Sequence, residues 1–122
     1  MNLASRLEGL TKIFAANIII SENVLKEVED EIELDYRFLG KVQVKGKNIM
    51  VAIYDVFSYD PKPIKTIKLQ IKESFESAIN LYQSDNFLEA KKIFKSVLEI
   101  YPEDLASQYY LDLIKDKLEE KS

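Results

Sequence analysis

The sequence contains no cysteine, no histidine and no tryptophan, and only three glycines and three prolines. Without cysteine the chain forms no disulfide and has no thiolate chemistry, and without histidine it also lacks the usual ligands of structural zinc. No apolar run approaches the roughly 20 residues that span a bilayer, and Met1 is not followed by a secretory signal region. We therefore expect a cytoplasmic chain without membrane contact, while segments outside it can still anchor a longer parent protein.

Charge and composition are those of a globular protein with an acidic balance. The net charge of −4 argues against a general nucleic-acid binder, because such proteins usually carry a basic patch and a high pI. Hydrophobic residues make up 47% of the chain and charged residues 31%, as in ordinary soluble domains. A length of 122 residues is enough for one domain or for two small units.

The first half of the sequence predicts a mixture of helices and strands. Apolar residues recur at helical spacing over residues 2–15, and the β-branched run Ile18–Ile20 predicts a buried strand. Ser21 is a suitable N-cap for a second helix. Alternation with a period of two then predicts a half-buried strand over Ile32–Phe38. The charged residues that alternate with its apolar ones are Glu33, Asp35 and Arg37.

A hairpin is expected to complete this half. Gly40 breaks the alternation and indicates a bulge or a close approach of another segment to the backbone. Lys45–Asn48 supplies turn residues, and Ile49–Phe57 predicts a final strand, antiparallel to the preceding one.

The second half is helical in pattern and follows a boundary marked by Pro61 and Pro63. Three helices are expected, with Asp104 as the N-cap of the last one. They cover Ile64–Tyr82, Phe87–Ile100 and Asp104–Leu118.

Asn2 and Arg6 stand four residues apart, so they share one face of the first helix, beside its apolar face. An amide is both a donor and an acceptor, and a guanidinium is a planar, permanent cation that suits phosphate oxygens. The segment Met1–Leu7 resembles the Val-Asn-x-Ala-x-Arg-Leu helix of class III nucleotide cyclases. Three later segments resemble the family's next motifs in the same order: Ile18–Ser21, Val42–Gly46 and Val51–Val56.

The resemblance covers about half of the chain and implies roles for three residues. Asn2 matches the residue that orients the ribose, and Arg6 matches the one that stabilises the pentacovalent phosphorus. Lys45 matches a lysine that contacts the terminal phosphates in some members. The implied reaction converts ATP or GTP into the 3',5'-cyclic nucleotide and pyrophosphate in intracellular signalling.

The chain departs from the family in lacking the segments that carry the two metal-binding aspartates and the purine-reading lysine. Carboxylates are needed to hold Mg²⁺ or Mn²⁺ in two-metal phosphoryl chemistry. The acidic cluster Glu29–Glu31 is expected to be a solvated helix end rather than a replacement. We therefore expect the full-length parent to use these metals and this chain to be inactive alone. In this family the active site forms between two catalytic domains, so a second cyclase domain, in a homodimer, is the expected partner.

The helical tail resembles one tetratricopeptide unit, although Ser74 stands where an aromatic residue is usual. The residues that match are Ala78, Ala90, Phe94 and Pro102. One unit is too few for an independent solenoid, so the tail is expected to pack or dimerise rather than to form a peptide groove.

Together these patterns predict an α+β fold, the C-terminal half of a ferredoxin-like cyclase domain with an all-helical tail. The predicted divisions are 1–58 for the partial cyclase domain, 59–66 for a linker and 67–122 for the tail. Two alternatives stay open: a non-enzymatic interaction module whose tail binds a protein partner, and a truncated regulator that pairs with a full-length cyclase.

Overall fold

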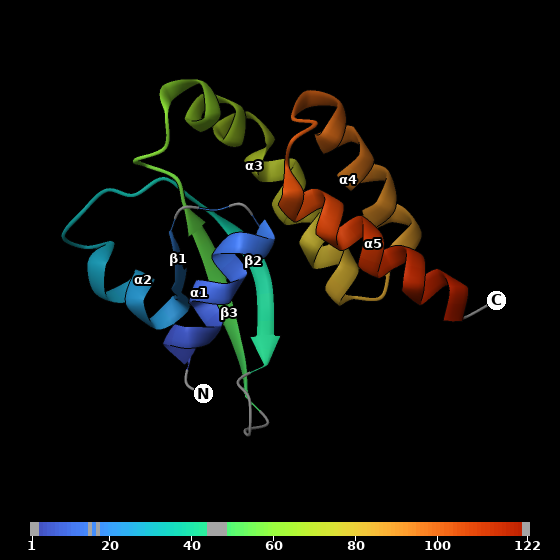
Figure 1. Cartoon of the computed structure of the whole chain (residues 1–122), viewed down its shortest axis with the longest axis horizontal. Coiled ribbons are helices and arrows are strands. Elements are labelled where there is room, and N and C mark those ends of the chain that lie inside the picture. The colour runs from blue at the N-terminus through green and yellow to red at the C-terminus, as the bar shows by residue number, and fades with distance from the viewer. Residues whose placement is uncertain (1–2, 15, 17, 44–48, 121–122) are drawn as a thin grey trace.

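The computed structural model describes residues 3–14, 16, 18–43 and 49–120, and of residues 3–8 only the backbone. The described part has the predicted α+β fold, with five helices and three strands (Figure 1). In chain order they are α1 (Leu3–Phe14), β1 (Ile19–Ser21), α2 (Glu22–Val28), β2 (Tyr36–Gln43), β3 (Met50–Val56), α3 (Lys62–Gln83), α4 (Phe87–Ile100) and α5 (Leu105–Glu120). The ferredoxin-like detail stays a prediction.

The three strands form one small antiparallel sheet in the order β1-β3-β2. The central strand β3 therefore pairs with both neighbours, which confirms the predicted hairpin of β2 and β3. Helix α2 packs against β1 and β3, while α3 packs against β2. Figure 1 shows the sheet with α1 and α2 on one side of the molecule and α4 and α5 on the other, while the long helix α3 runs from above the sheet to α4 and α5.

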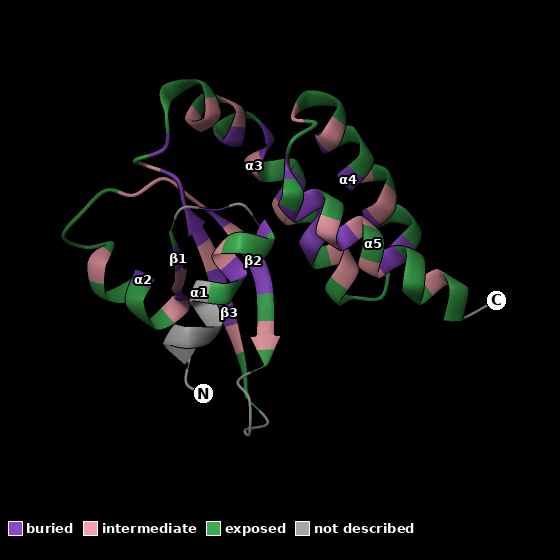
Figure 2. Ribbon diagram, in the orientation of Figure 1, coloured by how far each residue is buried: buried purple, intermediate pink, exposed green. Residues whose placement is uncertain are grey.

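One hydrophobic core joins the two halves of the chain (Figure 2). Leu10 and Phe14 of α1 and Leu39 of β2 belong to the same buried cluster as Phe75 of α3 and Ile114 of α5. The predicted division into two domains stays a prediction, but the described side chains of both parts bury one another.

The three long helices pack closely because small residues stand where they meet. Ala78 of α3 and Ala90 of α4 are completely buried, as is Phe94. An alanine side chain lets two helix backbones approach more closely than a larger one does. This is the packing that the tetratricopeptide resemblance requires, although the resemblance itself stays a prediction.

Two predicted boundaries differ from the structure. β2 begins at Tyr36 rather than at Ile32, because the N–H of Ile32 donates to the carbonyl of Val28 and so continues the end of α2. α3 begins at Lys62, inside the predicted linker. Pro63 does not prevent this, because the first turn of a helix has no intrahelical partner for its N–H groups.

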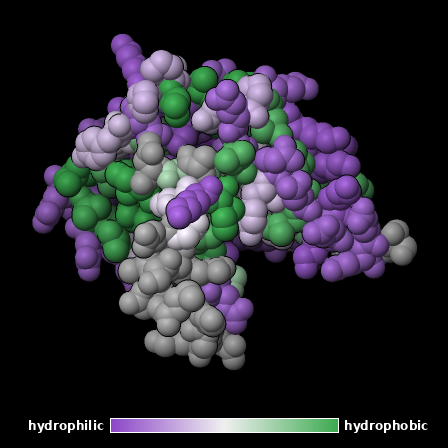
Figure 3. Space-filling model, in the orientation of Figure 1, coloured by the Kyte–Doolittle hydropathy of each residue, from purple (hydrophilic) through white to green (hydrophobic). Residues whose placement is uncertain are grey.

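The surface is polar over the helical tail and more apolar beside the sheet. Figure 3 shows hydrophilic residues over α4 and α5, and apolar residues gathered near α2. Val24 is 42% exposed there, and Ile32 is 47% exposed. No helix in the described ranges is long and apolar enough to cross a membrane.

Gly40 is both a bulge and a site of close approach, as its break in the alternation predicts. The register between β2 and β3 shifts between Phe38 and Gly40, and Gly40 has a φ of 109°. A Cβ atom there would collide with the hydroxyl of Tyr110. Glycine is therefore required at this position for two independent reasons.

Gly40→Ala is expected to lower the free energy of unfolding by about 3 kcal/mol, because it adds backbone strain and displaces a buried hydroxyl. The matched control is Gly9→Ala in α1, where a Cβ would meet nothing within 4 Å. That change should raise stability by roughly 0.5–1 kcal/mol, since alanine is the better helix former. Urea unfolding followed by circular dichroism measures both. An unchanged midpoint for Gly40→Ala would contradict the role assigned to the bulge.

Candidate functional site

The three residues predicted to act on the nucleotide lie where the structure describes little. Asn2 and Lys45 are outside the described residues, and for Arg6 only the backbone position in α1 is described. In Figure 1 the N-terminal end of α1 and the ends of β2 and β3 that flank residues 44–48 all lie toward the bottom of the view. The roles of these three residues therefore stay predictions.

The described part of α1 shows which of its faces is open. Leu10 and Phe14 are buried, whereas Gly9 is exposed and Ile13 is 46% exposed. On the helical repeat, position 6 falls between Ile13, which is exposed, and Leu10, which is buried. The face of α1 at Gly9 and Ile13 is therefore open, and position 6 lies at the border between this face and the core face.

The strongest electrostatic feature is one that the sequence patterns do not reveal. A buried charge cluster, made of two cations and three carboxylates, joins the sheet to α3 and to the start of α5. Its members are Arg37, Lys68, Asp55, Asp60 and Asp104.

Arg37 is the centre of this buried charge cluster. Its side chain is 1% exposed and donates from Nε to Oδ2 of Asp55 at 3.0 Å. Its Nη1 and Nη2 donate to the two oxygens of Asp104 at 3.0 and 2.9 Å. The guanidinium also lies 4.4 Å from the centre of the Phe75 ring. Such a two-pronged pair is stronger and more directional than a single hydrogen bond.

Lys68 and Ser107 complete the cluster. Nζ of Lys68 lies 2.8 Å from Oδ2 of Asp60 and 3.0 Å from Oδ2 of Asp55. The hydroxyl of Ser107 donates to Asp104 at 2.7 Å. Asp104 stands immediately before α5, and its carbonyl accepts the first helical bond from Gln108, which fits the predicted N-cap.

The directions of two pKa shifts indicate that the pair of Arg37 and Asp104 stays charged. Burial alone would raise the pKa of Asp104, but the hydrogen bonds and the charge of Arg37 outweigh it and lower that pKa. Burial likewise opposes the charge on Arg37, yet Asp104 and Asp55 together raise its pKa. Each partner therefore holds the other ionised at neutral pH.

The buried charge cluster links the sheet to the helical tail and is not a binding site. The three hydrogen bonds of Arg37 all go to protein carboxylates, and its side chain is only 1% exposed, so an incoming phosphate does not reach it. The sequence pattern placed Arg37 among the charged residues of a half-buried strand. The predicted alternation with a period of two is present, but Arg37 is on the buried face because α3 and α5 cover it. The neighbouring Tyr36 and Phe38 are only half-buried.

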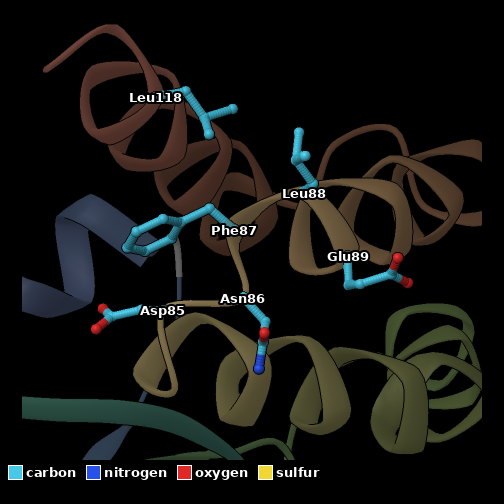
Figure 4. A pocket seen from close by; sticks show the side chains of 6 residues that line it. All are labelled: Asp85, Asn86, Phe87, Leu88, Glu89 and Leu118. Atoms are coloured by element: carbon cyan, nitrogen blue, oxygen red, sulfur yellow. The ribbon is translucent and has the colours of Figure 1, made fainter. Parts of the chain in front are cut away.

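The described residues contain no cluster that could hold a metal ion, and one pocket that they form is poorly suited to a nucleotide. They contain no group of three or more carboxylates placed to hold a metal ion, so they do not fit the Mg²⁺ or Mn²⁺ that the cyclase resemblance implies. A shallow pocket of about 410 Å³ opens beside the turn between α3 and α4, where Leu88 and Leu118 face the same space (Figure 4). Its lining includes Asp85 and Glu89 but no cation, which disfavours a polyphosphate.

Asp104→Asn should lower the free energy of unfolding at pH 7 by about 3 kcal/mol, because it leaves a buried cation poorly paired. In the wild-type chain, the free energy of unfolding should fall as the pH drops below about 4. The reason is that folding lowers the pKa of Asp104, so the unfolded state binds the proton first. The variant should lose this part of the acid slope. Asp112→Asn, at an exposed position in α5, is the control. Equal effects of the two substitutions would show that the pairing of Arg37 with Asp104 contributes nothing to the free energy of unfolding.

Three adenylate cyclases are similar to the chain. The "Adenylate cyclase, terminal-differentiation specific" of Dictyostelium discoideum is 30% identical over 112 residues, which are 91% of this chain and 5% of that protein. The adenylate cyclase of Anabaena cylindrica is 42% identical over 57 residues, 46% of this chain and 11% of that protein. Adenylate cyclase 1 of Rhizobium meliloti (strain 1021) is 34% identical over 56 residues, 46% of this chain and 8% of that protein.

The chain thus spans 5–11% of the lengths of these relatives. No protein-family model matches it, and no solved structure matches it. The Dictyostelium similarity extends over 91% of the chain, so it includes most of the sheet half and most of the helical half. These similarities support a relationship between this chain and the cyclase family.

Proposed function

We propose that this chain is the C-terminal part of a class III cyclase domain with its helical tail, in a protein that forms 3',5'-cyclic AMP and pyrophosphate from ATP. The similarity to an adenylate cyclase over 91% of the chain is the observation that carries the proposal. All three relatives are named adenylate cyclases, which favours ATP over GTP as the substrate.

The proposed chemistry assigns this chain the transition-state side of the site. Arg6 stabilises the negative charge that develops on the phosphate oxygens, and fixed cationic donors are most effective where water is excluded. Asn2 orients the ribose, and Lys45 binds the terminal phosphates as a compact point charge. The open face of α1 at Gly9 and Ile13 supports this proposal, because position 6 lies at its border.

Other parts of the assembly supply what this chain lacks. A second cyclase domain, in a homodimer, contributes the carboxylates that hold Mg²⁺ or Mn²⁺, and those ions supply charge neutralisation at the phosphates when bound. The chain by itself is therefore inactive in this proposal. The helical tail remains free to bind a further protein partner on its outer face.

Arg6→Ala, in the longer cyclase that carries this chain, should lower kcat by roughly 10²–10³, with a much smaller change in KM, because the lost donor acts in the transition state. Lys12→Ala is the matched control, since Lys12 is an exposed cation in the last turn of the same helix. Cyclic AMP formation from ATP with Mn²⁺ measures both variants. Wild-type turnover in Arg6→Ala, or equal losses in the two variants, would remove the assignment of this helix.

A further inference from the structure

One side chain of the helical tail contacts every layer of the core. Tyr110 of α5 is 6% exposed, and aromatic rings surround it. It stacks on Phe94 of α4 at 5.3 Å between ring centres and meets Tyr82 of α3 edge-on at 5.2 Å. It also stacks on Phe14 of α1 at 6.4 Å. Its ring is therefore fixed by three helices.

The hydroxyl of Tyr110 forms a hydrogen bond with β2. It donates to the backbone carbonyl of Leu39, at the bulge. A bulge leaves one residue of its strand out of the ladder, so this carbonyl needs a partner from elsewhere. Burial raises the pKa of Tyr110, followed by smaller effects of Tyr109 and Tyr82, which keeps the hydroxyl protonated and able to donate. The absent side chain of Gly40 leaves the space that the hydroxyl occupies.

The neighbouring residue strengthens the contact with α1. Tyr109 meets the ring of Phe14 edge-on at 5.1 Å. Two consecutive tail residues thus hold the C-terminal end of α1, while Tyr110 alone also holds the bulge of β2. A pair of aromatic contacts of this kind contributes beyond the area that it buries.

These two segments are the ones on which the proposed chemistry depends. α1 carries position 6, and β2 ends at Gln43, directly before the segment that includes Lys45. A change of register in β2 beyond Gly40 would turn each following residue to the other face of the sheet.

We propose that Tyr110 is a positioning residue that sets α1 relative to β2, so that the tail is a structural part of the proposed cyclase site. This inference rests on the proposed function for its link to the reaction, but the positioning itself is a property of the described contacts. The Dictyostelium relative supports it, because the similarity there includes most of the sheet half and most of the helical half.

Tyr110→Phe separates the two roles of this side chain, because it keeps the ring and removes the hydroxyl. In this chain, the amides of Lys41–Gln43 should exchange with solvent at least tenfold faster than in the wild type, whereas those of Leu10–Phe14, which pack on the retained ring, should change much less. The amides of α4 should be unaffected. Tyr109→Phe is the matched control, because its hydroxyl makes no hydrogen bond to a described residue. Wild-type exchange at Lys41–Gln43, or equal acceleration in every helix, would overturn the positioning role.

The link to catalysis is measured in the longer cyclase, at a temperature where circular dichroism shows all variants fully folded. Tyr110→Phe should reduce kcat about tenfold while KM for ATP stays within twofold, and Tyr109→Phe should retain the wild-type kcat. An unchanged kcat in Tyr110→Phe would refute the link to the reaction. If the wild-type protein forms no cyclic AMP, the proposed function fails, while the exchange result still decides whether Tyr110 positions α1 and β2.

Discussion

The buried pairing of Arg37 with Asp104 and Asp55 is the constraint on which the rest of the structure depends. A guanidinium that is 1% exposed has lost its hydration, and only carboxylates at hydrogen-bond distance can offset that cost. Asp55 comes from β3 and Asp104 from the start of α5, so the pairing is complete only when the sheet and the tail are docked. The position of α5 then determines where Tyr110 meets Phe14 and the Gly40 bulge.

This docking also protects the edge of the sheet. β2 is an edge strand, and the outward N–H of Phe38 donates to Glu76 of α3 at 2.7 Å. Lys72 of the same helix lies 4.4 Å from the centre of the Tyr36 ring. An edge strand that a charged helix covers, and whose N–H at Phe38 is already bonded, is a poor template for pairing with another chain. The tail thus covers an edge that the sheet half would otherwise expose.

Local patterns predicted most of the elements but not the contacts between them. Helical spacing predicted the ends of α1 and α4 to within a residue or two, and Gly40 predicted a bulge. These features could be predicted because they depend on residues that are neighbours in the sequence. Whether Arg37 faces water or the core depends on α3 and α5, which lie far along the sequence, so alternation alone could not decide it. Tyr110 was one aromatic residue among several, and only the fold shows that its hydroxyl reaches Leu39. The nucleotide-binding roles of Asn2, Arg6 and Lys45 came from a family resemblance and remain proposals.

The central claim is that the sheet and the helical tail form one cooperative unit. Two-dimensional NMR through a urea titration tests it most directly, by following amides of β3 and of α4 separately. The folded-state signals of both sets of amides should disappear at the same urea midpoint, because the buried charges of Arg37 and Asp104 are stable only together. An α4 that stays folded at urea concentrations where β3 has already unfolded would contradict this claim.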